Sequence, residues 1–231
     1  MLKQKLKISL FALLAIVLCG VMATSCSGNN DYGGYPDDIC IDFATFVSTS
    51  DNGSVFTLRK NGDSPLITLT AAVKIDTSKL KPDTRVLIQY VPSGGQAPYE
   101  SGSITLYGIA MIVTGDIEPQ SPATIQSWPS SPVKMTSMTR SGEYLDVWAQ
   151  GDYDSKITRF CLAADENTLE DEYPRLYLVF EGDSGIGYPH QLYASFNLSD
   201  AWLRETCKGV TISYQTASGS KTVTLNKTNN Q

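Results

Sequence analysis

Apolar and polar residues alternate along almost the whole of this chain, and this pattern restricts the fold more than any other feature. In ICIDFATFV (39–47), alternation places Ile39, Ile41, Phe43 and Val47 on one face of an extended strand. The same period of two recurs in nearly every later segment, with turn-rich stretches between the segments. The pattern predicts an all-β protein, and the lack of βαβ alternation argues against a nucleotide-binding α/β fold.

The first half of the chain contains five predicted strands. They are ICIDFATFV, SVFTLRK, LITLTAAV, TRVLIQYV and the longer GSITLYGIAMIVTG, separated by TSDNGS, KNGDSP and LKPDT and by a further loop. Gly108 lies inside the longest strand and indicates a bulge or bend there. Five strands at this spacing predict a small closed or nearly closed barrel over residues 39–117.

Clean alternation stops in the segment EPQSPATIQSWPSSPVKMTSMT (118–139), which has four prolines. Because proline stiffens a linker, we predict a restrained connection, part of which is a candidate edge strand. Six further strands follow in 140–231 and predict an antiparallel β-sandwich. The segment 199–209 is the one predicted helix in this half, with Ser199 as N-cap, Gly209 as stop and two or three turns between.

The N-terminus has the pattern of a secretory signal. Lys3, Lys5 and Lys7 form a basic tip, and the 15 residues from Ile8 to Met22 carry no charge. This apolar run is shorter than the roughly 20 residues of a membrane-spanning helix. We therefore predict a signal peptide over residues 1–25 that is removed on export.

Cys26 follows directly after three small residues, Ala23, Thr24 and Ser25. This arrangement resembles the lipobox of bacterial lipoproteins, although Ala23 stands where leucine is usual. Cys26 is therefore the predicted lipidation site, and the Gly-, Asn- and Asp-rich segment 26–38 is the predicted lipidated tether. The alternative is an ordinary signal peptide that leaves Cys26 as a free thiol.

Charge and histidine content exclude several classes of partner and site. The chain has 18 basic and 24 acidic residues, and three of the lysines but none of the acids precede residue 26, so the exported part carries about −9. Such a chain argues against nucleic acid as a partner. His190 is the only histidine, which argues against most hydrolytic triads, multi-histidine zinc sites and bis-histidine haem. We predict no cofactor, no metal and no catalytic residues.

Cys40, Cys161 and Cys207 are the other cysteines of the exported part. In an oxidising compartment, Cys161 and Cys207 are the more plausible disulfide pair, because both lie in the second half. The alternative, which we favour slightly, is that they are buried as small apolar side chains.

Three motifs resemble catalytic or metal sites. The GDSG stretch at 182–185 resembles the nucleophile loop of trypsin-like proteases, but no histidine precedes Ser184, so a turn is the better interpretation. The acidic run 165–172 and the GDYDSK stretch at 151–156 lack the spacing of a calcium loop, so we interpret both as solvated loops. Glu143, Asp146 and Glu181 offer carboxylates for glycoside hydrolysis, but the sequence does not place them across a cleft.

Aromatic residues alternate with apolar ones along the strands of the second half. The set comprises Tyr144, Trp148, Tyr177, Tyr193 and Tyr214. Such side chains either pack in a core or seam or form an exposed face that stacks on sugars or peptides. The sequence identifies no ligand-binding residue among them.

Taken as a whole, the chain resembles the NigD-like lipoproteins of Gram-negative anaerobes. The resemblance rests on the order of signal, lipid-type cysteine, tether with Cys40 and two β regions, and on the phrases GEYLDVWAQ, KITRFCLA and LYASFNLS. It implies an OB-like N-terminal barrel and a C-terminal β-sandwich. The family is named after a gene in a bacteriocin cluster, which implies an immunity or accessory role. The family has no assigned catalytic residues, so only Cys26 carries over, as the lipid site.

Together these features predict a non-enzymatic outer-membrane lipoprotein, periplasmic or surface-facing, that binds a protein or surface ligand. Its predicted partners are the membrane, through the lipid, and an unidentified protein or glycan. The alternative is a cell-surface carbohydrate-binding or glycan-processing lipoprotein, for which the aromatic and acidic residues above are the candidates.

Overall fold

The computed structural model describes residues 38–183 and 187–227, all within one compact unit that spans Pro36–Gln231. The predicted signal peptide, the lipid site at Cys26 and nearly all of the tether lie outside the described residues. Within the described ranges, no helix has the length and apolar character needed to cross a membrane.

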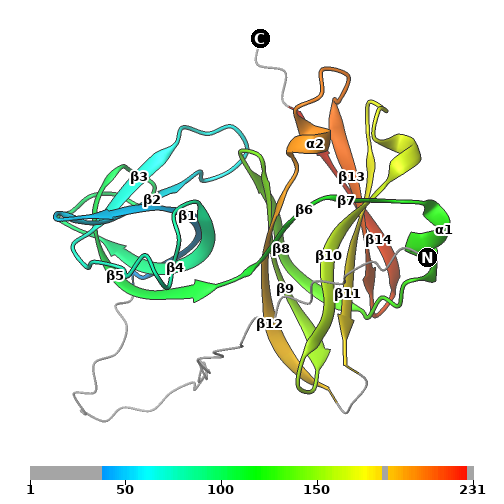
Figure 1. Cartoon of the computed structure of the whole chain (residues 1–231), viewed down its shortest axis with the longest axis horizontal. Helices are drawn as coiled ribbons and strands as arrows, with labels where there is room; N and C mark the ends of the chain where they lie inside the picture. The colour runs from blue at the N-terminus through cyan, green and yellow to red at the C-terminus, as the bar shows by residue number, and fades with distance from the viewer. Residues whose placement is uncertain (1–37, 184–186, 228–231) are drawn as a thin grey trace, which may run out of the picture. The chain divides into compact units, whose positions relative to one another are not determined.

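The N-terminal half forms the predicted five-stranded barrel (Figure 1). Its strands are β1 (Cys40–Ser50), β2 (Gly53–Leu58), β3 (Ile67–Ala71), β4 (Thr84–Pro92) and β5 (Gly102–Met111). They close in the order β1-β2-β3-β5-β4, and every neighbouring pair is antiparallel except β3 with β5. The closed five-stranded arrangement confirms the OB-like barrel that the resemblance implies.

Alternation along the barrel strands fills the interior with apolar side chains. Phe46 of β1 and Phe56 of β2 are fully buried, with ring centroids 5.7 Å apart. Ile88 and Tyr90 of β4 are fully buried as well. Since the intervening residues point outward, every second position of β1 and β4 is available to contact another part of the molecule.

The long strand of the sequence prediction is divided in two and joins the barrel to the sandwich. The predicted irregularity at Gly108 is a β-bulge: Gln89 pairs with Gly108 and Tyr90 with Leu106, which leaves Tyr107 as the extra residue. After β5 ends at Met111, a single residue separates it from β6 (Val113–Asp116), which pairs with a sandwich strand. The chain therefore passes from the barrel to the sandwich in an almost continuous extended conformation.

The C-terminal half is a sandwich of two sheets (Figure 1). One sheet has the order β14-β13-β11-β10-β7 and the other the order β6-β12-β9-β8. The remaining elements are β7 (Glu118–Gln120), α1 (Pro122–Ser127), β8 (Val133–Ser141), β9 (Tyr144–Tyr153), β10 (Ile157–Asp165), η1 (Glu166–Thr168), β11 (Arg175–Gly182), β12 (Tyr188–Asn197), α2 (Ser199–Trp202), β13 (Gly209–Thr216) and β14 (Gly219–Asn226).

The sandwich differs from the predicted one in its pairing. Four neighbouring pairs are antiparallel, as predicted, and three are parallel, namely β6 with β12, β7 with β10 and β11 with β13. The strands β6 and β7 come directly from the barrel and add to the sheet edges. The long connection through β12 and α2 lets β13 run in the same direction as β11.

The segment predicted as a connection, 118–139, belongs largely to the sandwich. It holds β7, α1 and most of β8. The side chain of Ser121 accepts a hydrogen bond from the backbone N–H of Thr124, and Pro122 opens the helix, which is the usual start of a short helix. The helix predicted over 199–209 is shorter than expected, because α2 ends at Trp202.

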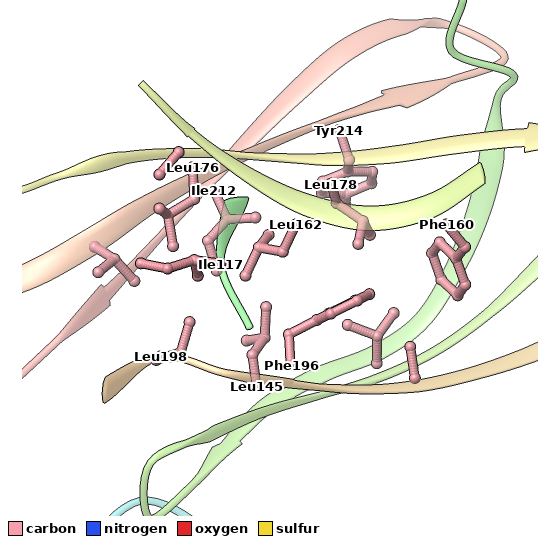
Figure 2. Packing of buried hydrophobic residues seen from close by; sticks show 14 of the residues in the cluster. Ile117, Leu145, Phe160, Leu162, Leu176, Leu178, Phe196, Leu198, Ile212 and Tyr214 are labelled. Atoms are coloured by element: carbon pink, nitrogen blue, oxygen red, sulfur yellow. The ribbon is translucent and has the colours of Figure 1, made fainter. Parts of the chain in front are cut away.

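The two sheets enclose one apolar core (Figure 2). Leu145 and Phe196 from the four-stranded sheet and Leu162 and Ile212 from the five-stranded sheet are all buried there. The ring of Phe160 makes edge-to-face contacts with Phe180 and Phe196, each at a centroid distance of 5.8 Å. Such contacts stabilise aromatic pairs beyond simple burial.

Candidate functional site

A buried polar cluster joins the barrel to the outer face of the four-stranded sheet. Arg85 on β4 is opposite Thr45 on β1, and both point out of the barrel. Asp146 on β9 is opposite Ser195 on β12, and both point away from the sandwich core. Strand register therefore places these four side chains on the two surfaces that meet, and we call their contact the junction.

Arg85 is the centre of the junction. Its Nη2 donates to Asp146 Oδ1 at 2.6 Å and its Nε donates to Ser195 Oγ at 3.0 Å. The guanidinium also lies 4.6 Å from the centroid of the Tyr144 ring. Arg85 is 6% exposed and Asp146 is 5% exposed, so water screens their ion pair very little. Asp146 further accepts from Ser195 Oγ at 2.6 Å, which leaves the carboxylate well satisfied.

A second arginine ties the barrel to the sandwich nearby. Arg140 at the end of β8 forms a two-pronged ion pair with Asp63 in the β2–β3 loop, with Nη1 donating to Oδ1 at 2.8 Å. The hydrogen bonds from Arg140 hold the pKa of the Asp63 carboxyl below its usual range. The other face of the Arg140 guanidinium lies 4.3 Å from the centroid of the Trp202 ring. The backbone N–H of Gly62 also donates to the Arg140 carbonyl at 2.6 Å, so the loop is fixed at several points.

A cleft of about 380 Å³ opens beside these two ion pairs, and we call it the junction cleft. Its lining includes three arginines, Arg59, Arg85 and Arg140, and two acids, Asp63 and Glu143. The Glu143 carboxylate accepts a hydrogen bond from Ser199 Oγ at 3.0 Å. The cleft can therefore offer guanidinium donors to a ligand from a partly enclosed site.

A third polar group occupies one end of the barrel. Asp42 Oδ2 accepts a hydrogen bond from the Tyr90 hydroxyl at 3.0 Å, and Oδ1 accepts one from the Tyr99 hydroxyl at 3.3 Å. Burial raises the pKa of the Asp42 carboxyl, although these hydrogen bonds oppose the shift. Burial also raises the pKa of the neighbouring Cys40 thiol, which makes it a weaker nucleophile at neutral pH.

Of the aromatic residues singled out in the sequence, Tyr144 and Tyr193 lie at the seam, and Trp148 and Tyr177 are half-buried outside the sandwich core. Tyr214 belongs to the sandwich core. Tyr193 lies 5.4 Å from Trp148 and 6.4 Å from Phe43 of the barrel, measured between ring centroids, so this group extends the junction. The Trp148 indole donates to Gln191 Oε1 at 2.7 Å, and both residues of this pair reach the outer sheet surface.

The three carboxylates considered for glycoside hydrolysis do not form a facing pair. Asp146 is buried under Arg85 and does not line the junction cleft. Glu181 belongs to β11 in the other sheet and lies 3.8 Å from Arg159. Of these three only Glu143 reaches the cleft, and the other carboxylate there, Asp63, is held in the ion pair with Arg140, so the three candidates do not face one another across a bond to be cleaved.

The GDSG stretch is partly described. Ser184 lies outside the described residues, whereas Asp183 accepts hydrogen bonds from the backbone N–H groups of Asp154 and Ser155 at 2.8 and 3.0 Å. Together with the Ser155 hydroxyl, these donors lower the pKa of Asp183 to about 2. Asp183 therefore fastens the β9–β10 connection, and Gly185, like Ser184, lies outside the described residues. His190 stacks on Tyr153 at a centroid distance of 4.0 Å.

The acidic run 165–172 is used in ion pairs. Arg175 pairs with Asp165 at 2.8 Å, Arg204 pairs with Glu170, and Lys208 pairs with Glu172. Within the part of the chain that the structure describes, no group of three or more potential metal ligands is found.

Cys161 and Cys207 are both buried free thiols, so the disulfide that we considered is not formed in the structure. Cys207 belongs to the sandwich core, where its Sγ lies 3.3 Å from the Gly209 carbonyl, whereas Cys161 is outside that cluster. Burial raises the pKa of the Cys161 thiol to about 11. Both residues behave as small apolar side chains, which was the second interpretation.

Arg85, Arg140 and Asp63 were not identified from the sequence. Each lies in a segment with an ordinary strand or turn pattern, and their partners are 61 and 77 residues away along the chain. The one available signal was an arginine at an outward position of an otherwise apolar strand, TRVLIQYV.

No family model matches the chain, and no curated protein matches it. Solved structures do. A protein of unknown function DUF1344 from Bacteroides vulgatus has 18% identity and a TM-score of 0.66, over 83% of this chain and 92% of that one.

Two further structures share the fold. A NigD-like immunity protein from Bacteroides caccae has 16% identity and a TM-score of 0.54, over 81% of this chain and 92% of that one. A candidate lipoprotein from Bacteroides fragilis has 12% identity and a TM-score of 0.55, over 84% of this chain and 100% of that one. The chain thus has the barrel-and-sandwich fold of NigD-like proteins, which confirms the resemblance seen in its sequence at the level of the fold.

Proposed function

We propose that this protein is a non-enzymatic, lipid-anchored protein of the outer membrane that binds a protein partner in an accessory or immunity role. The main supporting observation is the junction and the neighbouring Arg140–Asp63 pair, where ion pairs hold the barrel against the sandwich. Because each of these charged groups is already satisfied by another, the two ion pairs support a structural rather than a catalytic use of the junction. Two structural neighbours, a NigD-like immunity protein and a candidate lipoprotein, support the same role.

The lipid anchor is tested at Cys26. Acyl chains contribute about 0.8 kcal/mol per buried CH₂, so two or three chains hold a protein permanently on a bilayer. Intact-protein mass spectrometry of the exported protein should show the added mass of lipid, and the protein should sediment with the envelope fraction. The Cys26→Ser protein should lack the added mass and stay in the soluble fraction, with Cys40→Ser as the matched control. Equal masses and equal sedimentation of the Cys26→Ser and wild-type proteins would refute the anchor.

Binding is tested with the full chain in its own membranes. Affinity capture from detergent-solubilised envelopes should recover one protein in constant ratio, and capture through that protein should recover this chain. Recovery of no constant partner in both directions would contradict the proposed role.

The alternative function is carbohydrate binding on the outer sheet face. The observation that favours it is the Trp148–Tyr193 pair, whose indole N–H is held by the exposed Gln191. A glycan array probed with the protein should then show specific binding that Trp148→Ala abolishes. Trp128→Ala, which removes an indole stacked on Arg159, is the matched control. Binding of no glycan, or equal loss in both variants, would exclude this alternative.

A further inference from the structure

The side of the junction cleft around Asp63 has more positive than negative charge. Arg140 bonds Asp63 directly, and Arg59 and Lys227 act on the same carboxylate through space. Lys227 is placed by a hydrogen bond to the Arg204 carbonyl at 2.9 Å, and its Nζ lies 5.8 Å from the centroid of the Trp202 ring. Three cations thus surround a single carboxylate at this point.

Arg59 is the cation best placed to meet a ligand. It lines the cleft, is half-buried, and forms no ion pair with any carboxylate in residues 38–183 and 187–227. Its Nη1 donates to the Ser64 carbonyl, and its Nε lies 3.2 Å from where a Cβ at Gly142 would stand, so the loop and the β8–β9 turn hold the side chain in place. An ordered guanidinium with unused donors is a preorganised site for a carboxylate.

Apolar side chains flank these cations. Leu66 is 54% exposed and Leu203 is 60% exposed, and both line the cleft. Of the other charges of the lining, Arg85 is bound to Asp146 and Arg140 to Asp63, whereas Glu143 is exposed and accepts a hydrogen bond from Ser199. The groups of the cleft that have no ion-pair partner in the described part of the chain are therefore the Arg59 guanidinium and the Glu143 carboxylate, next to exposed leucine side chains.

The overall negative charge of the chain contrasts with the cations around Asp63. With a net charge of about −9, the exported part of the chain as a whole repels an acidic partner. Around Asp63, where Arg140, Arg59 and Lys227 outnumber the carboxylate, an acidic segment meets complementary potential, which favours one orientation of binding. An acidic segment that also carries leucine-like side chains matches the cleft in both charge and polarity.

We propose that the junction cleft binds an acidic, leucine-containing polypeptide segment of the protein partner, with Arg59 as the carboxylate contact. This deepens the proposed function, because it rests on the partner being a protein and names the chemistry that this chain recognises. Leu66 and Leu203 contact the apolar side chains of the segment.

The test uses the full chain in detergent solution and two short peptides, acetyl-Leu-Glu-Leu-Asp-amide and acetyl-Leu-Gln-Leu-Asn-amide. Calorimetric titration should give a Kd below about 1 mM for the acidic peptide and no measurable binding for the neutral one. Arg59→Gln should weaken binding of the acidic peptide by at least about tenfold. Lys221→Gln, which changes the net charge equally at an exposed position on β14, should leave the Kd unchanged.

A second variant keeps the test decisive if Arg59→Gln does not fold. Leu203 is exposed, so Leu203→Asp should fold normally and abolish binding of the acidic peptide by repulsion. Equal binding of both peptides, an unchanged Kd in both cleft variants, or no binding of the acidic peptide would overturn the proposal. If a partner is captured from envelopes equally by wild type and Arg59→Gln, the proposed function stands and this site for it fails.

Discussion

Arg85 and Asp146 show how a single buried ion pair organises this molecule. Both side chains are almost completely buried. Arg85 also donates to Thr45, and Asp146 also accepts from Ser141 and Ser195. Desolvation offsets much of the attraction between two buried charges, so the net contribution of the pair to stability is small. Removing only one partner should strongly destabilise the protein, because the other charge is then buried without a counter-charge.

We therefore expect Asp146→Ala to lower the free energy of unfolding by about 3–5 kcal/mol. The double variant Arg85→Met/Asp146→Leu should recover most of this loss, since it removes both charges and keeps apolar volume. The exposed pair Lys74–Asp51 is the control, and its removal should cost less than about 1 kcal/mol. Urea denaturation measures all three, and a single variant no less stable than the double one would contradict the argument.

Asp183 gives a pH dependence of known sign. Its pKa is about 2 in the folded protein and 3.8 in an unpaired carboxyl, because Ser155 and neighbouring backbone N–H groups donate to the charged form. A carboxyl with a lowered folded pKa stabilises the protein above pH 3.8, and this contribution is lost as the pH falls from about 4 to about 2. Asp183→Asn should therefore lose stability at pH 6 and show a flatter decline in that acid range. Thermal unfolding between pH 2 and pH 6 measures this, and parallel curves for the two proteins would refute it.

The pairing of the first barrel strands depends on a glycine at the start of β2. The turn between β1 and β2 contains Gly53, with φ of +115°, and a Cβ at this position would stand 2.0 Å from the Ala71 carbonyl oxygen. Only glycine both adopts this positive φ readily and leaves room for the backbone of β3 beside it. The hairpin that begins the barrel is thus fixed by one residue.

Gly53→Ala should destabilise the protein by about 1–3 kcal/mol or prevent it from folding, because the added methyl group forces β2 and β3 apart. Gly115→Ala is the control, since a Cβ there meets nothing within 4 Å. The free energy of unfolding from denaturant titration compares the two. Equal stability of both variants would show that the turn tolerates a side chain.

Barrel and sandwich are connected in two ways, by the nearly continuous strands β5 and β6 and by the junction. An extended strand with a single residue between two sheets leaves little freedom for the two parts to separate. The junction then adds buried side-chain contacts across the same boundary. These links couple the stability of the barrel to that of the sandwich.

Differential scanning calorimetry should accordingly show one unfolding transition for the wild-type protein. In Asp146→Ala the junction loses its central ion pair, and we expect the barrel and the sandwich to unfold in two separate transitions. A single transition in the variant, shifted only in temperature, would mean that the β5–β6 connection is sufficient for coupling. Lys74→Ala removes an exposed ion pair with Asp51 that is not part of the junction, so this variant should keep the single transition.

The sequence alone determined the strands and their alternation, but not which face of β1 is buried, because Ala44 and Phe46 fill the barrel while Ile41 and Val47 of the predicted face are exposed. Alternation located all five barrel strands and most sandwich strands, and Gly108 marked the bulge, because side-chain direction along a strand follows from local geometry. It did not identify α1 or the strands β6 and β7 as parts of the sandwich, since short elements carry too few residues to show a period.

The tertiary structure alone decided which surfaces meet. Alternation shows that Arg85 points out of the barrel, but not that Asp146, 61 residues later, covers it. The same holds for Arg140 and Asp63, which are 77 residues apart, and for the three parallel strand pairs. Contacts over such distances depend on the path of the whole chain, because every outward face offers the same local pattern until the fold selects its partner.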